Sequence, residues 1–202
     1  QDVKYAEDLG FRIKHLGIAR RAANGIELRV HPTLIPSEEL IANVNGVKNA
    51  VLVQAHAVGP TLYYGAGAGA GPTASAVVAD VIDIVRDISY TEDGAGTIPQ
   101  LAFEALTNVP ILSREQMTTG YYIRLNAEDQ TGVLADVTTI LSRAGISIDA
   151  IMQQSRLKDL IPIVILTDPV LESKMDEALA QIQALPTIHG EIIRIRLESL
   201  DS

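Results

Sequence analysis

A run of small residues, set between a short extended segment and a long apolar segment, constrains this 202-residue chain more than any other feature. Residues 61–88 read TLYYGAGAGAGPTASAVVADVIDIVRDI. A proline such as Pro72 is typical of the first turn of a helix, so residues 73–88 are predicted to be helical. Gly65, Gly67 and Ala70 fit the pattern G-x-G-x-x-A, which between a strand and a helix is typical of a dinucleotide-binding loop.

The residues that follow do not complete a dinucleotide site of the Rossmann type. Such a unit needs a second strand after the helix, with an acidic residue about 20 residues beyond the glycines. Here the helix runs into SYTEDGAGTIP, which has no strand pattern, and Asp83 and Asp87 lie inside the helix. Two interpretations of the glycines stay open. They permit either close approach to a flat ligand or tight packing of a largely buried helix on a sheet.

The composition indicates a globular protein that does not bind polyanions. The formal net charge is −9 and the sequence pI is about 4.8, whereas nucleic acids and anionic membranes attract clustered lysine and arginine. Charged residues interrupt the longest apolar segment, so no membrane span is predicted. The chain has no cysteine, which fits a cytoplasmic protein. The four histidines lack the spacing of metal ligands, and no metal site is expected.

Two hairpins are predicted in the first third of the chain. Asn24-Gly25 lies between two β-like segments, and this dipeptide is the strongest short signal for a hairpin. Pro32 predicts that the second strand has ended before that position. The strands are predicted at residues 11–19, 26–30, 50–58 and 61–65.

The pattern changes after residue 90. Residues 91–117 lose periodicity and are predicted to be a linker. Residues 118–202 then follow the order strand, helix, strand, strand, helix, strand, which is the ferredoxin-like arrangement. We therefore predict an α+β fold, with a mixed-sheet region at 1–90 followed by a ferredoxin-like βαββαβ domain at 118–202. Its strands are predicted at 121–128, 146–154, 161–167 and 191–200, and its helices at 131–145 and 169–185.

The loop that leads into the first helix of this second domain suits a free amino acid. N–H groups at the start of the helix can bind the ligand carboxylate, and the Asp129 carboxylate can accept from its ammonium group. Gly132 lets the backbone come close. The alternative is that Asp129 and Thr131 only cap the helix.

Four stretches together resemble the C-terminal half of bacterial homoserine dehydrogenases, and the resemblance covers almost the whole chain. They are GFRIKHLGIARRAANGIELRVHPTLIP, NAVLV, TLYYGAGAGAGPTASAVVADV and DQTGVLADVTTILSRAGISI. The resemblance implies NAD(P)-dependent interconversion of homoserine and aspartate semialdehyde, on the path to threonine and methionine. It also implies a nucleotide-binding domain and a catalytic lysine upstream of Gln1. Lys14 is expected to be structural, and no catalytic residue is assigned within this chain.

For the glycine run, the resemblance implies contact between Gly69 and the nicotinamide cofactor, NADP or NAD, with Gly67 beside it. The helix behind the loop would pack on the nucleotide-binding domain and leave its apolar face partly uncovered in this chain. We expect this chain alone to be inactive.

The final domain resembles an ACT domain, the amino-acid-sensing module of many biosynthetic enzymes. The resemblance implies an effector site at Asp129, Thr131, Gly132, Val133 and Leu134, together with Ser147, where the family often has Asn. Threonine is the expected effector, and association of ACT domains into a homo-oligomer is also expected. The alternative function is a non-enzymatic amino-acid-binding or dimerisation protein.

Overall fold

The computed structural model describes residues 1–90, 107–153 and 160–200 of the chain. The chain divides into two compact units, one made of Gln1–Ser37 with Val109–Ser202 and the other of Glu38–Asn108. The predicted boundaries at 1–90, 91–117 and 118–202 refer to family domains rather than to compact units, and they stay a prediction. Residues 91–106 of the predicted linker lie outside the described residues.

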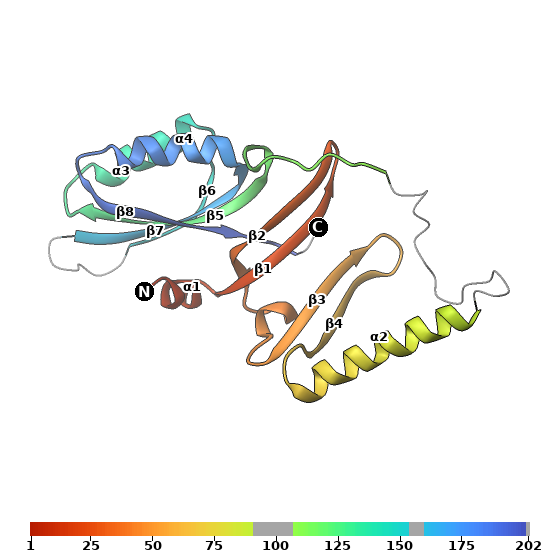
Figure 1. Cartoon of the computed structure of the whole chain (residues 1–202). Coiled ribbons are helices and arrows are strands. Elements are labelled where there is room, and N and C mark those ends of the chain that lie inside the picture. The colour runs from red at the N-terminus through yellow and green to blue at the C-terminus, as the bar shows by residue number, and fades with distance from the viewer. Residues whose placement is uncertain (91–106, 154–159, 201–202) are drawn as a thin grey trace. The chain divides into compact units, whose positions relative to one another are not determined.

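A six-stranded sheet with the strand order β1-β2-β8-β5-β7-β6 forms the first unit (Figure 1). Its last four strands, with two helices, have the predicted ferredoxin-like order, and the α+β class is confirmed. The strands are β1 (Phe11–Ala22), β2 (Gly25–Pro36), β5 (Thr118–Glu128), β6 (Ile148–Gln153), β7 (Leu160–Leu171) and β8 (Ile188–Leu197). The helices are α1 (Asp2–Asp8), the 3-10 helix η4 (Arg114–Gln116), α3 (Val133–Arg143) and α4 (Glu172–Gln183).

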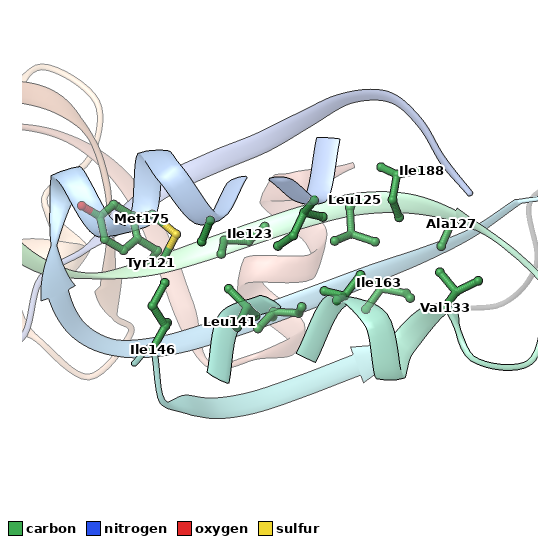
Figure 2. Close-up of a cluster of buried hydrophobic side chains, with 14 of the residues drawn as sticks. Tyr121, Ile123, Leu125, Ala127, Val133, Leu141, Ile146, Ile163, Met175 and Ile188 are labelled. Carbon is green, nitrogen blue, oxygen red and sulfur yellow. The ribbon is translucent and has the colours of Figure 1, made fainter. Parts of the chain in front are cut away.

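Both faces of the β5–β7 part of this sheet are covered. Helices α3 and α4 lie over one face, where apolar side chains such as Ile123, Leu141 and Met175 form the main core (Figure 2). On the other face α1 contributes Tyr5 and Ala6 to a second, smaller cluster. Because successive residues of a strand point to opposite faces, adjacent tyrosines of β5 are both fully buried, one in each cluster. They are Tyr121 in the main core and Tyr122 in the smaller cluster.

The first predicted hairpin is confirmed, but its strands are longer than expected. Residues Ala22 and Gly25 pair across the turn, and β2 continues through Pro32 to Pro36, so the predicted end before Pro32 is wrong. Beyond β1, the neighbour of β2 is β8, which pairs with it only at Thr33 and Leu34. A proline is tolerated here because no second ladder needs its missing N–H.

The second unit contains a hairpin and the long helix. Strands β3 (Lys48–Ala55) and β4 (Gly59–Ala66) pair in antiparallel register, preceded by a 3-10 helix η1 (Leu40–Asn43) and followed by α2 (Ala70–Tyr90). The apolar face of the long helix is uncovered in this chain, as the resemblance implies, so the interpretation of a largely buried helix does not hold within it. Its apolar side chains are 44% to 67% exposed, namely Val77, Val78, Val81, Ile82, Ile84, Val85 and Ile88. No helix among the described residues has both the length and the apolar character needed to cross a membrane.

Candidate functional site

Two glycines of the loop between β4 and α2 differ in what a side chain would meet. At Gly67 an added Cβ would lie 1.6 Å from Nδ2 of Asn49, the end of an exposed and flexible side chain, which would have to move aside. Gly69 has a φ of +119°, a conformation that favours glycine, and its carbonyl accepts from the N–H of Thr73 at 3.1 Å. The loop therefore presents backbone at the start of α2, whose first N–H groups have no partner within the helix.

The loop between β5 and α3 exposes most of the predicted effector residues. Asp129, Thr131 and Gly132 are exposed, and Leu134 is 36% exposed. Gly132 is itself the N-cap residue of α3, with a φ of +101°, and its carbonyl accepts from the N–H of Asp136 at 2.9 Å. Thus neither Asp129 nor Thr131 occupies the N-cap position itself.

Val133 differs from the other predicted effector residues. Its side chain is 4% exposed and belongs to the main core, so a ligand could contact only its backbone or its neighbours (Figure 2).

Ser147 lies far from this loop within one chain. It precedes β6, and Ile148 pairs with the same residue, Thr167, that pairs with Tyr121 near the start of β5. Glu128, at the end of β5, is seven residues further along that strand, or about 23 Å at 3.3 Å per residue. Ser147 and the loop that follows Glu128 therefore lie at opposite ends of the sheet. Ser147 lines an open depression together with Thr138, Thr139, Ser142, Arg143, Gly145, Ile146 and Ile148.

A network of charges around Glu172 was not predicted from the sequence. Glu172 is fully buried at the first position of α4, and it accepts from the hydroxyl of Tyr121 at 2.7 Å and from Nε of Arg196 at 2.9 Å. Burial alone would raise the pKa of Glu172. The hydrogen bonds from Arg196 and Tyr121 outweigh burial and hold that pKa below its ordinary value. Alternating arginines in the segment RIRL were the only sequence signal, since they put two cations on one face of a strand.

The remaining candidates do not form sites. Lys14, which the sequence analysis expects to be structural, is half-buried in β1 opposite Thr33. Among the side chains that the structure describes, no three of His, Asp or Glu come together as a metal site would require.

Comparison with known proteins identifies the family. The family model described as homoserine dehydrogenase matches residues 1–82, and the model described as ACT domain matches residues 121–187. Over 99% of its length the chain is 53% identical to a homoserine dehydrogenase of Pseudomonas aeruginosa and 49% identical to one of Neisseria gonorrhoeae. The chain belongs to the homoserine dehydrogenase family.

The chain spans about half the length of these homoserine dehydrogenases, since the matches cover 46% of each relative. A homoserine dehydrogenase crystal structure from Thiobacillus denitrificans superposes with a TM-score of 0.89 at 56% identity, over 98% of this chain and 45% of that one. A homoserine dehydrogenase structure from S. aureus, at 22% identity and a TM-score of 0.61, shares the fold. The resemblance stated from the sequence is confirmed, as is the ACT domain in the C-terminal part.

Proposed function

We propose that this chain is the C-terminal part of an enzyme that interconverts L-homoserine and L-aspartate 4-semialdehyde with NADP or NAD, in threonine and methionine biosynthesis. The observation that carries the proposal is the 53% identity to the Pseudomonas aeruginosa homoserine dehydrogenase along 99% of this chain. The alternative of a non-enzymatic amino-acid-binding protein does not account for the match of residues 1–82 to the dehydrogenase. In this proposal the enzyme is cytoplasmic and its catalytic lysine lies upstream of Gln1.

The glycine loop would form one wall of the cofactor cleft. Gly69 presents backbone rather than a side chain, and with Gly67 it precedes the N-terminus of α2, where partial positive charge favours the cofactor. The exposed valines and isoleucines of α2 would pack against a nucleotide-binding domain that supplies the other wall. Burying such an apolar face is favourable by about 25 cal/mol per Å².

Substitution at Gly69 in a full-length enzyme tests this wall. Gly69→Val should raise the KM for NADPH or NADH about tenfold, an effect of about 1.4 kcal/mol, because a β-branched residue resists positive φ and crowds the loop. Gly71→Ala is the matched control, since a Cβ at Gly71 meets nothing within 4 Å. An unchanged KM in Gly69→Val would refute a cofactor role for this residue. The 202-residue chain alone should show no turnover of homoserine, and measurable turnover would contradict that expectation.

The ACT domain would bind an amino acid as a feedback effector, and threonine is the proposed ligand. The loop at Asp129, Thr131 and Gly132 offers a carboxylate for the ligand ammonium and helix N–H groups for its carboxylate. Val133 would contribute its backbone, and Leu134 an apolar contact.

A second copy of the chain would bring Ser147 to this loop. Strand β6 is at the edge of the sheet, and it runs in the same direction as β5 because both are antiparallel to β7. If the β6 edges of two copies pair antiparallel, the start of one β6 comes to the end of the other, near the partner's Asp129 loop. The proposed homo-oligomer therefore completes an effector site that one chain divides between its two ends.

Thermal unfolding with added threonine tests the effector site. Threonine that binds the folded chain should raise the Tm by about 2–4 °C per kcal/mol of binding free energy. Asp129→Ala should abolish that shift, whereas Glu177→Ala, which removes an exposed carboxylate on α4, should retain it. A parent chain whose Tm does not change up to millimolar threonine would reject this effector.

A further inference from the structure

The buried face of β2 is polar, although its outer face carries apolar side chains. Glu27, Arg29, His31 and Thr33 alternate along this strand and are all less than 10% exposed, at 5%, 7%, 9% and 0%. Leu28 and Val30, which lie between them, are 46% and 70% exposed. Such an inversion of the usual strand pattern costs free energy unless the buried polar groups are satisfied.

Two ion-pair networks lie along this face. The first contains Arg20 and Arg29 with Glu27 and Glu198, so its charges balance. Among the residues that the structure describes, the second holds three arginines against two carboxylates, one positive charge in excess. Its members are Arg114, Arg194, Arg196, Glu172 and Asp176.

His31 lies within the electrostatic reach of both networks. The charged groups that act on its ring are Arg29 on its own strand, Arg196 on β8 and Glu172 on α4. Burial is the largest cause that lowers the pKa of His31, and the charges of Arg196 and Arg29 lower it further, against the carbonyl of Pro32 and Glu172. An anion beside the ring would act in the opposite direction.

Three buried nitrogen atoms on this face have no hydrogen-bond partner among the described residues. They are Nε and Nη1 of Arg29 and Nε2 of His31. The third nitrogen of the Arg29 guanidinium, Nη2, donates to Glu198 at 2.7 Å, and Nε is 3.6 Å from Glu27. Because the two residues are separated by one position of a strand, their side chains leave the same face of it. The charge of Arg29 acts on the His31 ring, so the unpartnered nitrogens belong to two neighbouring buried groups.

The protonation state of His31 determines whether a molecule or ion bound beside Nε2 must donate or accept a hydrogen bond. Nδ1 lies 3.0 Å from the carbonyl of Pro32, which can only accept, and 3.0 Å from the hydroxyl of Thr33, which can itself donate to the carbonyl of His31 at 3.2 Å. We therefore assign the hydrogen to Nδ1, where both neighbouring oxygens can accept it. In the neutral ring Nε2 is then an acceptor, and it becomes a donor when the ring is protonated. With Arg29 it then presents donors only, and a group of buried donors is satisfied by an anion.

We propose that Arg29 and His31 bind one small monovalent anion of halide size, and that its binding is coupled to protonation of His31. Neither residue belongs to the glycine loop or to the Asp129 loop. The anion would offset the excess positive charge of the neighbouring network and satisfy the unpartnered nitrogens. Because binding requires the protonated ring, affinity rises as the pH falls.

Bromide, which X-rays detect by anomalous scattering, is the probe. Crystals of the chain soaked in sodium bromide at pH 6 should show an anomalous peak within about 3.5 Å of Nε2 of His31 and Nη1 of Arg29. At pH 8 the peak should be weaker or absent. A water at this position at both pH values, or a peak of equal height at both, would overturn the proposal.

Thermal unfolding provides a second measurement, made at constant ionic strength by replacing sodium gluconate with sodium bromide. At pH 6 the Tm should rise by about 3 °C at bromide concentrations about tenfold above Kd, and at pH 8 by less. His31→Gln should remove the response. His15→Gln is the matched control, because His15 is exposed on β1 opposite Pro32, on the outer face of the hairpin. Should His31→Gln fail to fold, the crystals of the parent chain at the two pH values still decide.

Discussion

At the scale of single residues, glycines that look alike in the sequence differ in backbone conformation and in their surroundings. At Gly67 a Cβ would displace only the side chain of Asn49, whereas Gly69 has a positive φ that favours glycine. Gly71, two positions on, lies inside α2 and has open space around its Cα. Of these three glycines, only Gly69 has a positive φ.

Alanine substitutions should separate two of these glycines. Gly69→Ala is expected to lower the free energy of unfolding by about 1–2 kcal/mol, since a Cβ opposes positive φ. Gly71→Ala should instead raise it by about 0.5–1 kcal/mol, because alanine favours the helix. Urea unfolding followed by circular dichroism measures both. Equal effects of the two substitutions would mean that the loop does not hold Gly69 at positive φ in solution.

Glu172 should be the most sensitive carboxylate of the described chain. Glu172→Gln leaves Arg196 and Arg194 without a buried counter-charge, and it should cost about 3 kcal/mol of unfolding free energy at pH 7. Glu177→Gln, on the exposed side of the same helix, should cost less than about 0.5 kcal/mol.

The pH dependence of that difference follows from the lowered pKa of Glu172. A carboxyl whose pKa is lower in the folded chain than the ordinary 4.5 stabilises the fold above pH 4.5. This stabilisation is lost as the pH falls through the folded-state pKa. Parent and Glu172→Gln should therefore converge in stability at acid pH, and a constant difference from pH 7 to pH 3 would contradict the assignment.

At the scale of elements, α2 and α3 show that one apolar pattern can serve two surroundings. Both helices are amphipathic, yet Val137 of α3 is fully buried in the core while Val81 of α2 is 54% exposed. The difference lies in the neighbouring elements, because α3 rests on its own sheet. In the proposed enzyme, α2 rests on a domain outside this chain.

Substitution of one valine in each helix should measure this difference. Val81→Gln is expected to change the unfolding free energy of the chain by less than about 0.5 kcal/mol, whereas Val137→Ala should cost about 2 kcal/mol. Denaturant unfolding of both variants is the measurement. A loss of 2 kcal/mol or more in Val81→Gln would show that α2 is buried in solution.

At the scale of the whole molecule, the proposed effector site divides between two copies, and mixing variants can test this. In a two-fold pair, each site takes the Asp129 loop from one copy and Ser147 from the other. A hybrid of Asp129→Ala with Ser147→Val then has both changes in one site and none in the other.

Mixing these two variants should restore threonine binding that each variant lacks alone. Calorimetric titration should give no binding for either single variant, and up to one site per hybrid dimer after unfolding and refolding them together. The parent chain mixed with itself is the control for the refolding step. Binding that stays absent in the mixture, while the parent binds, would place the whole site within one chain.

Much of the fold could be predicted from sequence because its signals are local. The hairpin at Asn24-Gly25 and each strand and helix of the βαββαβ order depend on backbone preferences and side-chain periodicity within about 10 residues. The predictions that failed also have a physical reason. Pro32 did not end β2, since the mostly unpaired side of that strand needs no N–H there.

The candidate sites divide in the same way. By itself the sequence determined the family, the elements, and the loops at Gly69 and Asp129. Small residues and turn residues set the backbone conformation at their own positions, whatever the rest of the fold does. Only the tertiary structure decided that Val133 is buried, that Ser147 lies at the other end of the sheet, and that Arg29 and His31 share a buried face. Such facts depend on which strands become neighbours, and strand pairing joins residues too far apart in sequence for a local pattern to specify.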